Sequence, residues 1–227
     1  DESTLKSTLT SALNELKNLL DNYESGMIMT QGVNTVIAGR PNAGKSTLMN
    51  MLSGKETSIV THIEGTTRDI VENSVRLGTL VLHLSDTAGL RESDDVVEAI
   101  GIKKALERID TSSLVLAVFD SSRELDGDDK MLIDACKGKK AVAVINKTDL
   151  SPAIDTEEIE NNFESSVYIS AKNNTGLKEL ENAVKNILGV EEFDSSAPLI
   201  ANQRQKLCIQ KAYENISEAL SAGELCL

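Results

Sequence analysis

Residues 39–46 have the types and the spacing of a phosphate-binding loop. Their sequence, GRPNAGKS, fits the pattern G-x-x-x-x-G-K-[ST]. The glycines let backbone N–H groups turn toward phosphate oxygens, the lysine reaches the β- and γ-phosphates, and the serine hydroxyl can ligate Mg²⁺. A strand-like run at 33–38 precedes this loop and a helix-like run at 47–52 follows it. Because the motif requires strand, glycine turn and helix in that order, we predict a nucleotide phosphate site here.

Four shorter motifs follow in the order that a GTP-binding domain requires. They are Gly65-Thr66-Thr67, Asp86-Thr87-Ala88-Gly89, Asn146-Lys147-Thr148-Asp149 and Ser170-Ala171-Lys172. A hydroxyl at Thr67 can ligate Mg²⁺, Asp86 can hold the ion through a water molecule, and the Gly89 amide can face the γ-phosphate. The Asp149 carboxylate can accept hydrogen bonds from the guanine N1–H and amino group, which adenine does not offer. A backbone N–H of the last motif can meet the guanine carbonyl oxygen.

Each motif has an ordinary explanation when it is taken alone. An Asn-Lys-x-Asp sequence after a strand can be a polar turn, and Gly-Thr-Thr occurs in loops of many kinds. Five motifs in order, at the carboxyl ends of predicted strands or between them, favour one ligand in the crevice of an open α/β sheet. We therefore predict a GTP or GDP site with Mg²⁺. Its residues are Asn42, Ala43, Gly44, Lys45, Ser46, Thr47, Thr66, Thr67, Asp86, Thr87, Ala88, Gly89, Asn146, Lys147, Asp149, Ser170, Ala171 and Lys172, of which Ser46, Thr67 and Asp86 serve Mg²⁺.

Length and composition suit one main domain with a smaller part beside it. The 227 residues are 40% hydrophobic and 26% charged, as in ordinary globular proteins, and no apolar run approaches the ~20 residues of a membrane span. The formal net charge of −13, without a basic cluster, argues against direct nucleic-acid binding by this stretch. Cys136, Cys208 and Cys226 are widely spaced and lack a metal-ligand pattern, which favours a reducing compartment. We expect a cytoplasmic protein without a membrane partner.

Alternating apolar strands and amphipathic helices predict the fold around these motifs. Strands are expected at 33–38, 71–77, 80–85, 114–119, 141–145 and 167–169, with the second and third forming an antiparallel hairpin. Helices are expected near 95–109, 128–136, 155–162 and 177–188, the last of them closed by Gly189. This order implies an α/β domain whose mostly parallel sheet has helices on both faces.

Helical segments bracket that domain. Apolar residues recur every three or four positions over 4–24, where Gly26 is the expected helix stop, and again over about 199–222. We predict a helical segment at 1–28, a GTPase domain at 29–190, and a linker with a second helical segment at 191–227. The two apolar faces are expected to pack on each other or on a region outside this sequence. Because no stop signal closes the last helix, we expect the chain to be a fragment.

Several stretches resemble the translation-factor-related GTPases, and most closely the MnmE (TrmE) family of tRNA-modification GTPases. They are the loop at 39–46, IVTHIEGTTRD at 59–69, DTAGLRE at 86–92 and VEAIGI at 97–102. The resemblance implies a Ras-like P-loop GTPase domain inserted between helices of a helical domain. It also implies GTP hydrolysis coupled to a carboxymethylaminomethyl-type modification of the wobble uridine in tRNA. The family's folate-binding domain and its cysteine-containing tail have no counterpart in this sequence.

The resemblance also implies catalytic roles. Leu90 stands where Ras-like proteins place a glutamine that orients water, and the family's water-orienting glutamate matches Glu98. The alternative is that Glu98 is one more solvated acid in an acidic run. Lys45 and Thr67 are the other predicted catalytic residues, and Thr61 joins the nucleotide site. A K⁺ ion that replaces an arginine finger is implied at Asn42, Thr61, Ile63 and Thr66, with Arg40, Arg68 and Arg91 as rival sources of positive charge.

The implied partners are a second G domain in a homodimer, an MnmG-type flavoprotein, and tRNA held by the full-length complex. One competing function is a ribosome-assembly switch of the Era or Der type, which would show a second G domain or a basic RNA-binding domain. Another is a scaffold that binds GTP without hydrolysing it, against which the complete set of phosphate and Mg²⁺ motifs counts.

Overall fold

The computed structural model describes residues 2–54, 74–84, 108–190, 200 and 202–225. The chain divides into two compact units, one made of residues 32–191 and the other of residues 1–31 and 192–227. The first unit contains the phosphate-binding loop. The second joins the two ends of the chain. Each unit is described separately below.

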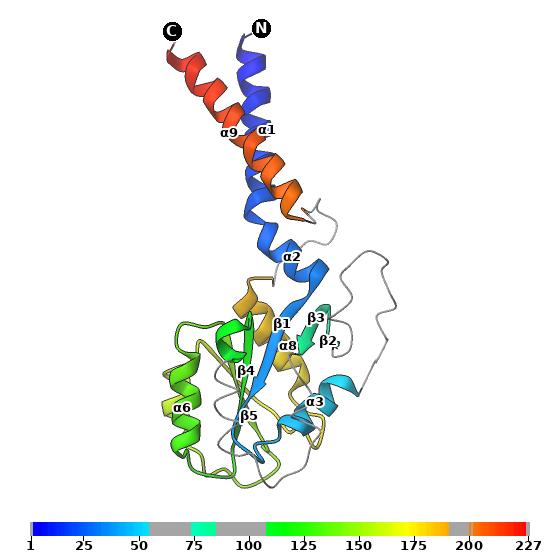
Figure 1. The fold of residues 1–227 in the computed structure, drawn as a ribbon, viewed down its shortest axis with the longest axis vertical. Coiled ribbons are helices and arrows are strands. Elements are labelled where there is room, and N and C mark those ends of the chain that lie inside the picture. The colour runs from blue at the N-terminus through cyan, green and yellow to red at the C-terminus, as the bar shows by residue number, and fades with distance from the viewer. Residues whose placement is uncertain (1, 55–73, 85–107, 191–199, 201, 226–227) are drawn as a thin grey trace. The chain divides into compact units, whose positions relative to one another are not determined.

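The larger unit is built on a six-stranded sheet with the order β2-β3-β1-β4-β5-β6 (Figure 1). Its strands are β1 (Val33–Ala38), β2 (Ser74–Leu77), β3 (Leu80–Leu84), β4 (Leu114–Asp120), β5 (Ala141–Asn146) and β6 (Ser165–Tyr168). Only the β2–β3 pair is antiparallel, and the other pairs are parallel. Every residue of β4 and β5 is buried, as expected for central strands covered on both faces.

Helices lie on both faces of this sheet, as the sequence predicts. They are α3 (Lys45–Ser53), α6 (Gly127–Cys136), α7 (Thr156–Glu160) and α8 (Leu177–Leu188). Helix α8 packs on β5 and β6 with a face that includes Leu180 and Val184, and it ends at Gly189 with a φ of +69°. Of the helix predicted at 95–109, the described residues are 108 and 109, which are helical; the others lie outside the described residues.

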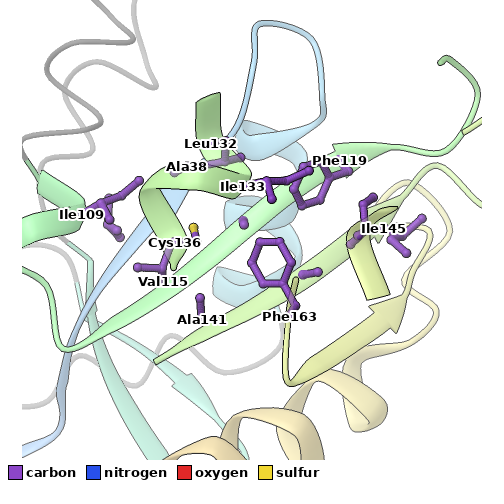
Figure 2. Packing of buried hydrophobic residues seen from close by; sticks show 14 residues of the cluster. Ala38, Ile109, Val115, Phe119, Leu132, Ile133, Cys136, Ala141, Ile145 and Phe163 are labelled. Carbon is purple, nitrogen blue, oxygen red and sulfur yellow. The ribbon is translucent and has the colours of Figure 1, made fainter. Parts of the chain in front are cut away.

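One apolar core fills the space between the sheet and helices α6 and α7 (Figure 2). Small residues of the central strands, among them Ala117 and Ala143, leave room for larger side chains. The rings of Phe119 and Phe163 meet edge to face with centroids 5.8 Å apart. Cys136 belongs to this cluster, and burial raises the pKa of its thiol to about 12, which keeps the thiol protonated and unreactive.

The smaller unit consists of α1 (Glu2–Asp21), α2 (Tyr23–Gln31) and α9 (Gln203–Leu225). Helices α1 and α9 pack on each other. The Tyr23 hydroxyl donates to the Gln203 side-chain oxygen at 3.0 Å, and the Lys206 ammonium lies 4.4 Å from the centre of the Tyr23 ring. Tyr23 near one end of the chain therefore contacts Gln203 and Lys206 near the other.

The helix stop predicted at Gly26 is wrong. Gly26 is a buried residue inside α2, where its N–H donates to the Asn22 carbonyl at 2.9 Å and its carbonyl accepts from the Thr30 hydroxyl at 2.8 Å. An interior glycine costs a helix only about 1 kcal/mol relative to alanine, so kept hydrogen bonds and burial outweigh it. The left-handed residue that follows the helix is Gly32, with a φ of +76°.

Candidate functional site

The phosphate-binding loop connects the end of β1 to the start of α3. Gly44 precedes the helix with a φ of +97°, and Asn42 has a φ of +61°, so the backbone turns through two left-handed residues. A side chain at Gly39 would collide with the Val118 carbonyl of β4. Gly44 offers no side chain to cap α3, which leaves the first N–H groups of that helix available to an anion.

Lys45 is the first residue of α3, and its side chain folds back over the loop. Its Nζ donates to the Arg40 carbonyl at 2.7 Å. An ammonium group has three N–H donors, so this contact aims the group and leaves capacity for phosphate oxygens. Burial lowers the pKa of Lys45, because desolvation disfavours the charged form. A phosphate beside the ammonium would supply the compensating charge.

Asn146 links the phosphate-binding loop to the predicted guanine motifs. Its Nδ2 donates to the Ala43 carbonyl at 3.0 Å, and its Oδ1 accepts from the Ala171 N–H at 3.0 Å. The side chain of Asn146 is almost fully buried, at the carboxyl end of β5. These two hydrogen bonds fix three motifs that lie far apart in the sequence into one edge of the sheet.

Asp149 and Ser170, two residues of the predicted guanine site, are in contact. The Ser170 hydroxyl donates to Asp149 Oδ1 at 2.6 Å. This hydrogen bond lowers the pKa of the Asp149 carboxyl, so the group is ionised at neutral pH. One oxygen is thus held by the protein, and the exposed carboxylate can still accept from a base. Lys172, the last residue of this motif, is exposed.

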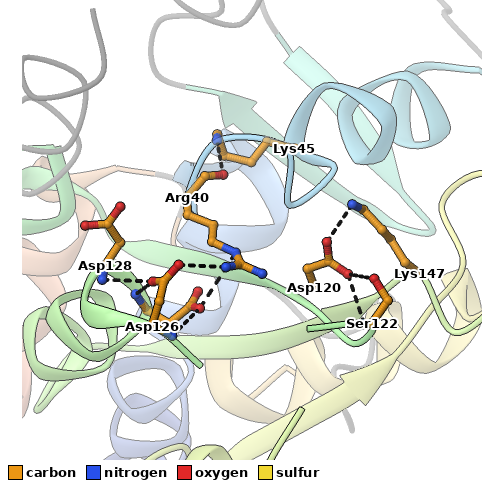
Figure 3. Close-up of polar contacts among 8 residues, drawn as sticks. Arg40, Lys45, Asp120, Ser122, Asp126, Asp128 and Lys147 are labelled. Atoms are coloured by element: carbon orange, nitrogen blue, oxygen red, sulfur yellow. Dashed lines mark hydrogen bonds and ion pairs between the residues drawn. The ribbon is translucent and has the colours of Figure 1, made fainter. Parts of the chain in front are cut away.

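Asp120 is a residue of this site that the sequence analysis missed. It ends β4 and is almost fully buried, with its Oδ2 at 2.6 Å from Lys147 Nζ. Its Oδ1 accepts from the Ser122 N–H at 3.0 Å and the Ser122 hydroxyl at 2.7 Å (Figure 3). Lys147 has a φ of +67°, a strained conformation for a residue with a side chain. Asp120 therefore sets the direction of Lys147.

The remaining predicted site residues lie outside the described residues. They are Thr61, Ile63, Thr66, Thr67, Asp86, Thr87, Ala88, Gly89 and Glu98. In the described part, Ser46 and Thr47 stand in the first turn of α3, where the Ser46 hydroxyl is the hard oxygen donor that Mg²⁺ prefers.

The described residues contain no cluster of three or more His, Cys, Asp or Glu side chains able to hold a metal ion. They also include no helix that is long and apolar enough to cross a membrane.

Comparison with known proteins bears on this geometry. The model of a family described as 50S ribosome-binding GTPase matches residues 34–147. The tRNA modification GTPase MnmE of Clostridioides difficile (strain 630) is 38% identical over 226 residues, or 97% of this chain and 49% of that protein. MnmE of Natranaerobius thermophilus is 38% identical over 227 residues, or 99% of this chain and 49% of that protein. The G domain of the T. maritima FeoB iron transporter is 24% identical with a TM-score of 0.47, over 68% of this chain and 98% of that one.

The chain spans about half the length of the curated relatives that it matches. The family model begins in β1 and ends at Lys147, directly after β5, so it includes the phosphate-binding loop and its link to Asn146. The MnmE relatives extend the likeness over nearly the whole chain. The chain therefore belongs to the family described as 50S ribosome-binding GTPase. It carries a GTPase domain of the MnmE type, as its motifs predict.

Proposed function

We propose that this chain is the GTP-hydrolysing part of a tRNA-modification GTPase that acts on the wobble uridine. The observation that carries the proposal is the extent of the MnmE likeness. It covers 97% of the chain, including the terminal helices, whereas the general GTPase family model covers only residues 34–147. A ribosome-assembly switch would share the G domain and has no reason to share those helices.

In this proposal the described residues bind and orient the nucleotide. The phosphate-binding loop and Lys45 hold the phosphates, and the Asp149 carboxylate, oriented by the Ser170 hydroxyl, holds the guanine edge. Ser46 would hold Mg²⁺ with Thr67 and, through water, Asp86. When bound, Mg²⁺ offsets the charge that develops on the phosphates during transfer. Ser46 supplies the donor type that this ion needs, at the end of the helix that faces the phosphates.

Glu98 is proposed to orient the attacking water, because Leu90 has no polar group for that task. Replacing Glu98 with glutamine or alanine should lower kcat roughly a hundredfold, the usual scale for a positioned acid or base. The dissociation constant of GDP should stay unchanged, since the interaction is used only in the transition state. Single-turnover phosphate release and GDP titration measure the two effects. Hydrolysis at the wild-type rate in these variants would show that Glu98 is only a solvated acid without a catalytic role.

A monovalent cation is proposed beside the phosphates, held by Asn42, Thr61, Ile63 and Thr66. Asn42 is exposed at the turn of the loop, and its left-handed φ allows glycine to replace it without backbone strain. GTP hydrolysis should be about tenfold faster in KCl than in NaCl at equal ionic strength, a difference of about 1.4 kcal/mol in the barrier. Asn42→Gly should abolish this difference and spare GDP binding, which Lys45 and the loop amides support. Equal rates in both salts for the wild type would refute the cation site.

The proposed assembly is a homodimer of G domains that forms around this cation, with an MnmG-type flavoprotein and tRNA as partners of the full complex. Sedimentation with GDP and aluminium fluoride should therefore show a dimer in KCl and a monomer in NaCl. The net charge of −13 is consistent with tRNA being held by other parts of the complex.

A chimera tests the role in tRNA modification. This chain replaces the aligned segment of the C. difficile relative, and the chimera is expressed in bacteria that lack their own tRNA-modification GTPase. Mass spectrometry of the tRNA should show the modified wobble uridine restored. The same chimera with Lys45→Ala should fail, and the unaltered relative is the positive control. A folded chimera that hydrolyses GTP and leaves the uridine unmodified would overturn the proposal.

A further inference from the structure

The structure places Arg40 under the phosphate-binding loop, where its side chain and its backbone do different work. The backbone carbonyl accepts from Lys45 Nζ at 2.7 Å and from the Ala43 N–H at 3.4 Å. The guanidinium runs in the opposite direction, toward the start of α6 (Figure 3). The Arg40 side chain is only 8% exposed. Arg40 thus contacts both the Lys45 ammonium and the start of a helix that begins more than 80 residues later.

Two aspartates at the start of α6 form ion pairs with the Arg40 guanidinium. Arg40 Nη1 lies 2.7 Å from Asp126 Oδ2, and Arg40 Nε lies 3.7 Å from Asp129 Oδ2. The same aspartates form the capping box of α6: Asp126 Oδ1 accepts from the N–H groups of Asp128 and Asp129, and Asp129 Oδ2 accepts from the Asp126 N–H at 3.2 Å. The helix cap and the arginine are therefore one hydrogen-bonded cluster.

Burial of Arg40 and Asp129 makes this cluster sensitive to the loss of their contacts, whereas the Asp126 side chain is half-exposed. Asp129 is 2% exposed and burial raises its pKa, although the Asp126 N–H and the Arg40 charge act against the rise. Within the described residues, Arg40 Nη2 and Asp129 Oδ1 are buried without a hydrogen-bond partner. A buried charge that loses its partner must rearrange, because neither water nor another group replaces the interaction. A rearranged Arg40 side chain no longer braces the backbone whose carbonyl accepts from Lys45.

We propose that Arg40 is a positioning residue, whose guanidinium is anchored by Asp126 and Asp129 so that its carbonyl fixes the phosphate-binding loop and Lys45 for the nucleotide. This inference rests on the GTPase function of the chain. It also argues against Arg40 as a positive charge that acts on the transition state. The guanidinium contacts Asp126 and Asp129 and points away from the Lys45 ammonium. A pre-formed loop binds phosphate without paying for its own ordering.

The test replaces Asp126 with asparagine. The asparagine oxygen can still accept from the two capping N–H groups, so the helix cap survives. The amide nitrogen that replaces Oδ2 cannot accept from Arg40, so the ion pair is lost. We expect Asp126→Asn and Arg40→Gln each to raise the dissociation constant of GDP and the KM for GTP about tenfold, with kcat within about twofold. Arg40→Gln removes both contacts of the guanidinium, including the one that Asp126→Asn breaks, so the double variant should bind GDP no more weakly than Arg40→Gln alone.

The matched control is Asp155→Asn, the same substitution at the cap of α7. Asp155 accepts from the Glu157 N–H at 3.0 Å and has no arginine among its contacts in the described residues, so nucleotide binding should not change. An unchanged dissociation constant in Asp126→Asn, even with lowered thermal stability, would overturn the proposal by making the cluster merely structural. A fall in kcat above tenfold with unchanged GDP affinity in Arg40→Gln would overturn it in favour of a catalytic charge. Failure of the wild-type chain to bind GDP would instead contradict the GTPase function itself.

Discussion

Replacing Asp149 with asparagine should convert the site from guanine to xanthine nucleotides. In the proposed site the carboxylate accepts from the guanine N1–H and amino group, whereas an asparagine amide would offer a donor that suits the second carbonyl of xanthine. We expect the dissociation constant of GDP to rise roughly a hundredfold and that of XDP to fall below it, since a site built for hydrogen bonds strongly rejects a mismatched base. Fluorescence titration with labelled GDP and competition by XDP measure both values.

Ser170→Ala is the matched control for this change. It keeps the Asp149 charge and removes the 2.6 Å hydrogen bond that orients the carboxylate. Binding of GDP should weaken by only about tenfold, without a gain for XDP, because a single oriented hydrogen bond is lost. If Asp149→Asn binds GDP as tightly as the wild type, the assignment of the guanine edge to this residue is wrong.

Replacing Gly44 with alanine should abolish nucleotide binding under ordinary assay conditions. Gly44 has a φ of +97°, which costs about 1–2 kcal/mol for a residue with a Cβ atom. The added methyl would also collide with the Asn146 amide, which holds Ala43 and Ala171 in place. Loss of two charge-assisted bonds to phosphate, about 1.5–3 kcal/mol each, corresponds to a GDP affinity lower by roughly a hundredfold or more.

Two other glycines serve as controls that distinguish backbone strain from steric collision as the cause of the lost binding. Gly138 has a φ of +73° with open space around the position of a Cβ, so Gly138→Ala should lower thermal stability and leave GDP binding intact. Gly127 has neither a left-handed φ nor a close neighbour and lies in α6, so Gly127→Ala should leave GDP binding intact and should not lower thermal stability. Calorimetry with GDP and thermal denaturation of the three variants give the comparison. Normal GDP affinity in Gly44→Ala would show that the loop geometry is not what binds phosphate.

Much of the fold could be predicted because its strands are marked by strong local patterns. The run at 141–145 is wholly apolar, and β5 extends it by one residue to Asn146. The prediction of β6 at 167–169 was less accurate, because Ser165 and Ser166 are polar and pair with β5 through their backbones, which side-chain patterns do not reveal. The helix stop predicted at Gly26 was wrong because sequence pattern does not reveal burial either. A glycine is a helix stop only where the chain turns away, and burial kept this one inside a helix.

Candidate site residues could be predicted from motifs that follow or lie between predicted strands. Their mutual contacts could not. Asp126 and Asp129 have the spacing of a capping box, which predicts the start of α6 and says nothing of Arg40. Asp120 ends a wholly apolar strand, and its single charge gave no hint of a pairing with Lys147. Such long-range pairings depend on strand order, which sequence periodicity does not encode.

Phosphate release from GTP and from ATP by this chain, in KCl with Mg²⁺, tests the central claim most directly. The Asp149 carboxylate, which the Ser170 hydroxyl orients, is proposed to accept from a base with two adjacent donors, which guanine has and adenine lacks. The account predicts turnover of GTP, no measurable turnover of ATP, and loss of GTP turnover in Lys45→Ala. Equal turnover of the two nucleotides, or activity that survives Lys45→Ala, would contradict it.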